Sequence, residues 1–582
     1  MDVAAKLNEG REYHRQGRLG DAGRCYQAVL QADPDNVDAL NLMSVLAQMA
    51  GDNTMAAQLA WRAIQLQPDW AAPYVSFGNA CQAAGDVARA ADAFQKAVTL
   101  NPEQPEAYIN LASALNELGR HAEAVKMAVE AIVIDSSLPE AHNTFGNSLA
   151  GMDSPEEAIE AFQKAVYLRP DWDAPWFNIG TALAAQDKHD EALAVYRRSI
   201  GLADAPIKHY NLANSLAALG RLSEAEAEYR IALEQAPGYV DAHNNLGTTL
   251  KDMERLSESE ACLRAAIELA PDSPDLHWNL ALTLLMQGKW ADGWREYEWR
   301  WRMPTFLPFA RDFGRPQWDG GDVAGKTVLV SAEQGFGDAI EFCRFVPLLA
   351  ARGATVVMEC RAGLKRLFAT LAGVERVVSP GDEYGAFDLT VPLMSLPHRL
   401  QATLADLPAA LPYLAVPDAV ASFADVAAQP GLKVGLVWAG GASRRDNSQR
   451  SCRAADFAPL LDVPGCRFFS LQVGPLADQI ADLPGIVDLA PRLGDFADTA
   501  AAIAALDLVI SVDTGVVHLA GALGKPVRVL LSKPSNGFLW MLGMADSPWY
   551  PGVLKILRQP VAGDWPTVFA GLRAELVALA GR

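Results

Sequence analysis

The sequence predicts an all-α repeat array followed by an α/β region with two parallel sheets. Two observations predict this. Prolines recur at Pro34, Pro68, Pro102, Pro170, Pro237 and Pro271, so the gaps are 34, 34, 68, 67 and 34 residues. Beyond residue 326, short β-branched strands alternate with helical stretches, as in a parallel sheet. A chain of 582 residues is also too long for a single core.

The first half has the period of a tetratricopeptide repeat (TPR), about 34 residues with two helices per unit. Small residues recur where paired helices must touch: Gly10, Gly78, Gly146, Gly180 and Gly247 at one repeat position, and Ala22, Ala56, Ala90, Ala124, Ala158, Ala192 and Ala225 at another. We expect a TPR superhelix over residues 1–300, with eight full repeats and a partial ninth that starts at Pro274. Such arrays bind extended partners on a concave face.

Asparagine recurs at the sixth repeat position, although TPR folding does not require it there. The positions are Asn8, Asn110, Asn178, Asn211, Asn245 and Asn279, and the series is interrupted by Leu42, Ser76 and Thr144. A side-chain amide can donate to and accept from one peptide unit at once. We therefore predict that Asn110, Asn178, Asn211, Asn245 and Asn279 hold a protein acceptor by its backbone. The alternative is that they satisfy hydrogen bonds between helices.

An aromatic stripe closes the array. In KWADGWREYEWRWRMP, the residues Trp290, Trp294, Tyr297 and Trp301 follow one face of a helix. Because the net charge argues against stacking on nucleic acid, we expect this face to join the last repeat to the next domain.

The second half contains two sets of strands and helices. Strands are predicted over 326–333, 355–360, 376–380 and 387–393 in the first set, and over 433–440, 466–473, 506–513, 526–532 and 553–560 in the second. We place linkers at 301–325 and 417–431, one Rossmann-like unit at 326–416, and another at 432–582 that ends in a helix. A ligand cleft is expected between the carboxyl ends of the two sheets.

Several blocks in residues 300–560 resemble known enzymes: AEQGFGDAIEF, VWAGGASRRDNSQRS, FFSLQVGP, DLVISVDTGVVHLAGALGKPV and DSPWYP. They look like the GT-B fold of nucleotide-sugar glycosyltransferases, in particular the heptosyltransferase type that is fused to TPR arrays. The asparagine ladder is similar to that of protein O-GlcNAc transferases. The resemblance implies a nucleotide-sugar donor, no metal or other cofactor, and a protein acceptor, with flagellin as the first candidate.

The resemblance also implies roles for single residues. Asp338 matches a Gly-Asp turn that carries the proposed catalytic base, although Asp338 with Glu341 also fits a helix-capping pair. Phosphate ligands are implied in the loop with Arg444, Arg445 and Arg450, where a solvated charged loop is the alternative. The remaining donor-binding candidates in the matching blocks are Gly337, Gly440 and Gln472.

The stretch SVDTGVVHLAG, residues 511–521, predicts a strand that runs into a helix. Spacing assigns Val516, Leu519, Ala520 and Leu523 to the buried helix face, with Thr514 and His518 on the opposite side. The free N–H groups of a helix start bind phosphate well. We therefore predict that Asp513, Thr514, Gly515 and His518 bind the donor diphosphate. The alternative is Asp513 as an N-cap with a surface histidine.

Composition excludes other classes. A formal net charge of −21 argues against nucleic acid and anionic membranes as partners. No run of 18 apolar residues and no apolar leader is found, and seven scattered cysteines fit a reducing cytoplasm. A dinucleotide fingerprint at Gly335 and Gly337 is disfavoured because Ile340 occupies the third glycine position.

We thus expect a cytoplasmic, bacterial-type protein glycosyltransferase that acts on Ser or Thr. Two alternatives remain, a lipopolysaccharide-type heptosyltransferase and a non-catalytic TPR scaffold. The scaffold is favoured by SKPSNGFLW, residues 532–540, because the relatives tend to be rich in tryptophan there.

Overall fold

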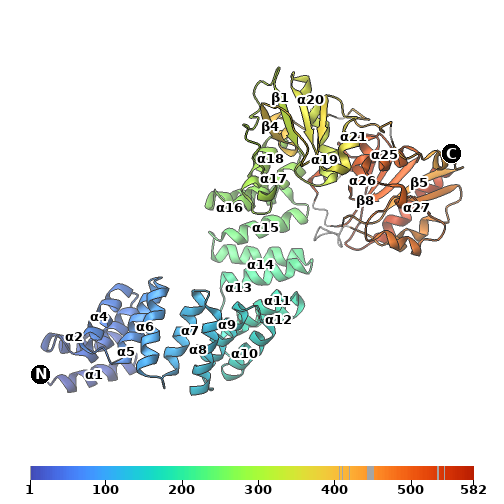
Figure 1. The fold of residues 1–582 in the computed structure, drawn as a ribbon. Coiled ribbons are helices and arrows are strands. Elements are labelled where there is room, and N and C mark those ends of the chain that lie inside the picture. Colours follow the sequence, from blue (N-terminus) through green and yellow to red (C-terminus); the bar gives the residue numbers. More distant parts are fainter. Residues whose placement is uncertain are drawn as a thin grey trace. The chain divides into compact units, whose positions relative to one another are not determined.

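The computed structural model of the chain describes residues 2–405, 407–408, 410–418, 420–441, 451–533, 537–542 and 544–581. The chain forms two compact units, Met1–Pro237 and Gly238–Arg582 (Figure 1). The predicted boundary at residue 300 follows the end of the repeat pattern. The compact units divide earlier, so the last repeats belong to the same unit as the sheets.

The first unit consists of seven pairs of helices, as the repeat period predicts. Their bounds are α1 (Val3–Arg15), α2 (Leu19–Ala32), α3 (Val37–Met49), α4 (Asn53–Leu66), α5 (Ala71–Ala83), α6 (Val87–Leu100), α7 (Pro105–Glu117), α8 (His121–Ile134), α9 (Pro139–Gly151), α10 (Pro155–Leu168), α11 (Asp173–Ala185), α12 (His189–Leu202), α13 (Pro206–Ala218) and α14 (Leu222–Gln235). At two of the repeated glycines, an aromatic ring of the paired helix occupies the space that a side chain would need. A Cβ on Gly78 would sit 2.5 Å from the Phe94 ring, and one on Gly146 would sit 2.5 Å from the Phe162 ring. The predicted close approach of paired helices is therefore confirmed.

The second unit begins with two further helix pairs, α15 (Val240–Asp252), α16 (Leu256–Leu269), α17 (Pro274–Met286) and α18 (Trp290–Tyr297). The aromatic stripe packs as predicted at three of its four positions. The Trp290 ring lies 5.0 Å from that of Trp549, and the Trp294 ring lies 5.6 Å from that of Phe342. Tyr297 is 1% exposed.

The prediction for Trp301 is wrong. A 3-10 segment, Glu298–Arg302, follows α18 and changes the angular step between residues. Trp301 therefore leaves the buried face and is only half-buried, whereas Arg300 becomes inaccessible to solvent.

Two parallel sheets follow. The sheet of the first lobe, residues 326–416, has the order β3-β2-β1-β4, with β1 (Thr327–Ser331), β2 (Thr355–Glu359), β3 (Val374–Val378) and β4 (Leu389–Pro392). Its α-helices are α19 (Phe336–Phe342), α20 (Val346–Ala351), α21 (Lys365–Phe368) and α22 (Leu396–Arg399). Every predicted strand of this lobe is present.

The second lobe, residues 432–582, carries the sheet β10-β9-β8-β5-β6-β7, all parallel. Its strands are β5 (Leu432–Val437), β6 (Cys466–Ser470), β7 (Val487–Asp488), β8 (Leu508–Val512), β9 (Val527–Leu531) and β10 (Leu554–Arg558). The short edge strand β7 was not predicted. The α-helices are α25 (Phe496–Ala504), α26 (Gly515–Ala522) and the C-terminal α27 (Trp565–Ala580), and α23 (Ala424–Ala427) precedes the lobe.

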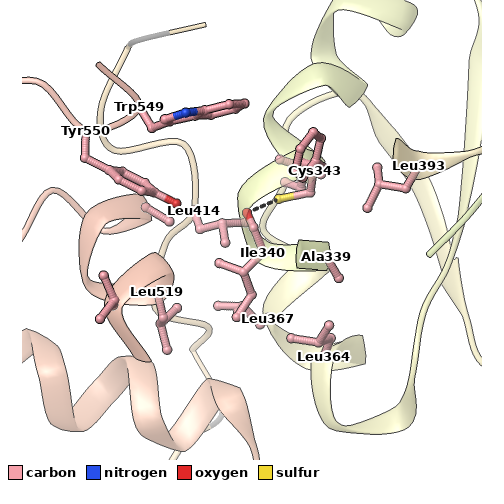
Figure 2. Packing of buried hydrophobic residues seen from close by; sticks show 14 of the residues in the cluster. Ala339, Ile340, Cys343, Leu364, Leu367, Leu393, Leu414, Leu519, Trp549 and Tyr550 are labelled. Atoms are coloured by element: carbon pink, nitrogen blue, oxygen red, sulfur yellow. Dashed lines mark hydrogen bonds between the residues drawn. The ribbon is translucent and has the colours of Figure 1, made fainter. Parts of the chain in front are cut away.

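The two lobes pack on each other through α19 and α26. Figure 2 shows Leu519 and Tyr550 of the second lobe facing Ile340 of the first, within one buried apolar cluster. This packing brings the starts of α19 and α26 together.

Candidate functional site

One cavity of about 920 Å³ in the second unit collects most of the predicted site residues. Its lining includes Gly337, Asp338, Gly440, Gln472, Asp513, Thr514, Gly515 and His518. These residues follow β1, β5, β6 and β8, because parallel strands deliver their carboxyl ends to the same edge of a sheet. The volume lies within the range of pockets that hold small organic ligands. Arg444, Arg445 and Arg450 lie outside the described residues.

The first wall is the start of α19. Asp338 is half-buried, and its Oδ2 accepts a hydrogen bond of 3.0 Å from the N–H of Gly335, the N-cap residue. The carboxylate therefore closes the first helical turn and borders the cavity at once. The expected capping pair of Asp338 with Glu341 is not formed, since Glu341 is buried one turn further along against α26.

The second wall is the start of α26. Thr514, rather than Asp513, is the N-cap, and its Oγ1 accepts from the N–H of Val516 at 3.3 Å. The same hydroxyl lies 3.0 Å from the Oγ of Ser511. The Asp513 carboxylate is therefore not used as the helix cap.

His518 is neither on a solvent-facing side nor a surface residue. It is 4% exposed, because α26 is enclosed between its sheet and α19, while Val516 and Leu523 of the predicted buried face are only half-buried. Burial, assisted by the nearby charge of Arg344, lowers the pKa of His518 to about 4, although Asp513 opposes this. The imidazole is therefore neutral at neutral pH.

Two glycines allow the helix starts to approach. A Cβ on Gly337 would lie 3.2 Å from Cδ2 of His518, and one on Gly515 would lie 3.5 Å from the backbone nitrogen of Gly337. The first distance is too short for a side chain unless the imidazole shifts, whereas the second is an ordinary van der Waals contact. The glycines thus place the imidazole and two helix starts around one point.

Gln472 and Gly440 border the cavity in a different way. The Gln472 Oε1 accepts from the N–H groups of Trp438 and Ala439 at 3.1 and 2.9 Å, and its Nε2 donates to the Val473 carbonyl at 3.0 Å. This amide is therefore occupied in holding the chain after β5. Gly440 donates its N–H to the Ser451 hydroxyl at 3.3 Å.

The last repeat also contributes to the cavity, which was not predicted. Trp278 and Leu282 of α17 line it with Phe306, and the Trp278 ring lies 5.0 Å from the rings of both Phe306 and Tyr297. The Tyr297 hydroxyl accepts a 3.0 Å hydrogen bond from Gln334, just before the turn with Asp338. The spacing of the aromatic stripe predicts contact between the last repeat and the next domain. It does not predict that this region lines a cavity.

The position of Glu359 bears on the dinucleotide interpretation of the first glycine turn. Glu359, where a dinucleotide enzyme would bind ribose, is 1% exposed and accepts from Arg311 at 2.7 Å and from the Tyr384 hydroxyl at 2.8 Å. Among the described residues, no group of three or more His, Cys, Asp and Glu side chains is arranged to hold a metal ion. No helix in the described part of the chain has the length and apolar character that a membrane crossing requires.

The ladder asparagines make local hydrogen bonds in each unit. In the first unit, the amide nitrogen of Asn178 donates to Asn143 and Asn147 of the preceding repeat, at 3.0 Å each. Asn110 donates to Asn79 at 3.1 Å, and Asn211 donates to a backbone carbonyl of its own helix.

In the second unit, Asn279 donates to Asn244 at 2.9 Å, and Asn244 lies 3.5 Å from Asn245. In the first unit, the carbonyl oxygen of Asn178 accepts no hydrogen bond from a described residue, whereas in the second unit that of Asn245 lies 3.5 Å from the Asn244 amide nitrogen.

Family comparisons agree with both halves of the chain. Residues 7–71, 76–139, 143–206 and 216–281 match tetratricopeptide repeat families, and residues 475–538 match glycosyltransferase family 9 (heptosyltransferase). The glycosyltransferase family 9 match contains β8 and α26, and it therefore includes Asp513 to His518. Protein FlbA of Caulobacter vibrioides is 31% identical over 328 residues, which are 49% of this chain and 52% of that protein. The chain thus spans about half the length of this curated relative.

Similar solved structures include a TPR protein. YrrB, described as a TPR protein with an unusual peptide-binding site, is 28% identical, with 32% of this chain and 96% of that one covered and a TM-score of 0.28. MamA is 27% identical, with 28% and 94% covered and a TM-score of 0.26. By the family matches, the chain contains TPR repeats within residues 7–281 and, at residues 475–538, a segment of glycosyltransferase family 9 type.

Proposed function

We propose that the chain is a protein glycosyltransferase that moves a sugar from a nucleotide-sugar to a Ser or Thr hydroxyl of a protein acceptor. One observation carries this. A single cavity is lined by Asp338 of the first lobe, by residues 513–515 and His518 of the second, and by Trp278 of the last repeat. Acid–base, donor-binding and repeat-derived groups therefore meet at one place.

In the proposed reaction, Asp338 takes the proton of the acceptor hydroxyl. The hydroxyl oxygen forms a bond to the anomeric carbon while the bond from that carbon to the diphosphate breaks. The leaving diphosphate gains charge, and the N–H groups at the start of α26 stabilise it by hydrogen bonds and the helix dipole. No metal enters this scheme, and TPR repeats supply the acceptor-binding surface.

The decisive test compares Asp338→Asn with Asp456→Asn. Asp456 caps its own helical turn in the same way, accepting from the Arg453 N–H at 2.8 Å, but it does not line the cavity. We expect Asp338→Asn to slow transfer by about 10²–10⁴-fold, and Asp456→Asn to stay within about twofold. The measurement is the intact mass of a co-expressed acceptor over time, with flagellin tried first. Equal loss in both variants would assign Asp338 a capping role only.

A nucleotide panel separates the alternatives. Calorimetry against UDP, ADP, GDP and CMP would show no binding if the chain is a non-catalytic scaffold. Nucleotide binding with no change in acceptor mass for any protein tested, but transfer to a lipid-linked glycan, would favour the lipopolysaccharide-type enzyme.

The ladder can be tested inside the first unit. Asn178→Ala combined with Asn211→Ala removes two amides, each worth about 1 kcal/mol of hydrogen bonding to a peptide. We expect acceptor capture to weaken about tenfold or more. Asn143→Ala with Asn147→Ala is the matched control, because it removes only the local partners of Asn178. If the two pairs weaken capture equally, or if Asn178→Ala with Asn211→Ala leaves capture unchanged, the asparagines serve helix packing alone.

A further inference from the structure

The His518 imidazole lies in a closely fitted slot between the lobes. Gly337 of α19 leaves room for its ring edge, and the Trp540 ring stacks on it at 5.4 Å with an angle of 23°. The Tyr550 hydroxyl lies 3.1 Å from Nδ1. Packing therefore fixes the position of the ring. Its polar neighbours determine which of the two ring nitrogens carries the hydrogen.

Glu341 is the other polar wall of this slot. It follows Gly337 by one helical turn, so both residues face α26. Its side chain is 1% exposed, and Oε2 lies 3.4 Å from Nδ1 of His518. Neither carboxyl oxygen has a hydrogen-bond partner among the described residues. An orphan carboxyl of this kind costs free energy unless it serves a neighbour.

The surroundings decide the charge of Glu341. Burial raises its pKa well above the usual range, and the charges of Asp338 and Asp513 act in the same direction, against Arg344. Arg344 makes no ion pair with this carboxyl, because its guanidinium donates to the Trp549 carbonyl at 2.6 Å and the Tyr413 hydroxyl at 3.0 Å. A neutral carboxylic acid can donate a proton.

The second imidazole nitrogen favours one tautomer. Nε2 of His518 lies 3.9 Å from the carboxylate of Asp513, at the cavity. A hydrogen on Nε2 would be attracted to that carboxylate, whereas a lone pair there would be repelled. Nδ1 must then accept a hydrogen bond, and the two groups able to donate are Glu341 and Tyr550.

We propose that Glu341 is a positioning residue that donates its carboxylic proton to Nδ1 of His518 and so holds the Nε2–H toward Asp513 and the cavity. The Tyr550 hydroxyl, which lies within hydrogen-bond distance of Nδ1 at 3.1 Å, then donates to its second neighbour, the Tyr413 hydroxyl at 3.4 Å. In this arrangement His518 acts toward a bound anion as a neutral N–H donor. The interaction of His518 with a bound anion rests on the proposed function, whereas the tautomer of His518 does not.

The test reads the tautomer directly. The full chain is labelled with imidazole-¹⁵N histidine, and the signal of His518 is assigned among nine histidines by its loss in His518→Asn. We expect an Nε2–H tautomer in the wild type and in Glu341→Gln, because a Gln amide can still donate. Glu341→Leu cannot donate, so its spectrum should gain the Nδ1–H form, and its kcat should fall about tenfold with little change in KM.

Tyr550→Phe is the second variant, and it keeps the proposal falsifiable if Glu341→Leu folds poorly. We expect the Nε2–H tautomer to persist in Tyr550→Phe. Loss of that tautomer in Tyr550→Phe, or its full retention in folded Glu341→Leu, would overturn the role of Glu341. A shifted tautomer in Glu341→Leu with no transfer activity in any form, wild type included, would instead refute the proposed function alone.

Discussion

Glu333 and Glu341 are both buried carboxyls of the first lobe, on either side of the glycine turn that carries Asp338. Glu333 accepts from Arg300 and from the Met394 N–H, at 3.2 Å each. Glu341 has no hydrogen-bond partner among the described residues and faces the imidazole of His518. Burial raises the pKa of both, but only Glu333 has a direct ion pair that opposes it.

The difference separates two uses of a buried carboxyl. Glu333 is part of a joint: Arg300 also bonds Glu298 at 2.6 Å and Ser395 at 2.8 Å, and so ties the segment after α18 to the first lobe. Glu341 joins no such network. Removing one member of a buried ion pair leaves the other charge uncompensated in the interior. Removing a neutral carboxylic acid leaves no such charge. The two residues should therefore respond in opposite ways to substitution.

The largest expected effect on stability is at the buried ion pair of Arg300 with Glu333. Arg300→Met leaves Glu333 buried without its cation, and we expect the free energy of unfolding to fall by about 3–5 kcal/mol. Arg302→Met is the matched control on the same segment, because its side chain is 62% exposed and its pair with Asp272 is long, at 3.9 Å. Such an exposed pair contributes less than about 1 kcal/mol.

Urea denaturation of the full chain, followed by tryptophan fluorescence, measures both variants. Similar losses for Arg300→Met and Arg302→Met would show that the joint does not depend on the buried pair.

Much of this contrast could not be read from the sequence. Periodicity located the repeats, both parallel sheets and the helix starts, because these depend on local spacing. Asp513 to Gly515, which line the cavity, could be predicted from the strand that precedes them, whereas Asp338 was predicted from the family resemblance. For Glu341, the i, i+3 spacing from Asp338 offers a capping pair as one alternative, because local spacing is the only relation that the sequence can test.

The partners of the misread residues come from distant segments. Amphipathic spacing places His518 on an open helix face, because it assumes that one side of a helix meets solvent. Here α19 covers that side, and the covering helix comes from the other lobe. Trp278 likewise borders the cavity only because the last repeat packs beside the first lobe.

The smallest expected effect is a pH-dependent one, and it tests the contrast most directly. The pKa of Glu341 is raised in the folded chain, so above the ordinary value of 4.5 the unfolded chain releases this proton while the folded chain keeps it. The folded state then binds more protons than the unfolded state, and its stability falls as pH rises. Glu341→Gln has no ionisable carboxyl at this position, so it does not lose stability in this way as pH rises.

We therefore expect Glu341→Gln to equal the wild type near pH 4.5 and to become more stable above it, by on the order of 1–2 kcal/mol at pH 8. Glu333→Gln leaves Arg300 buried without a full counter-charge, so it should be less stable than the wild type at pH 4.5, and the gap should narrow as pH rises because burial raises the pKa of Glu333 as well. Urea midpoints at pH 4.5, 6 and 8 measure these differences. A Glu341→Gln curve parallel to that of the wild type would mean that Glu341 is ionised in the folded chain, and that it faces His518 as an anion instead of an acid.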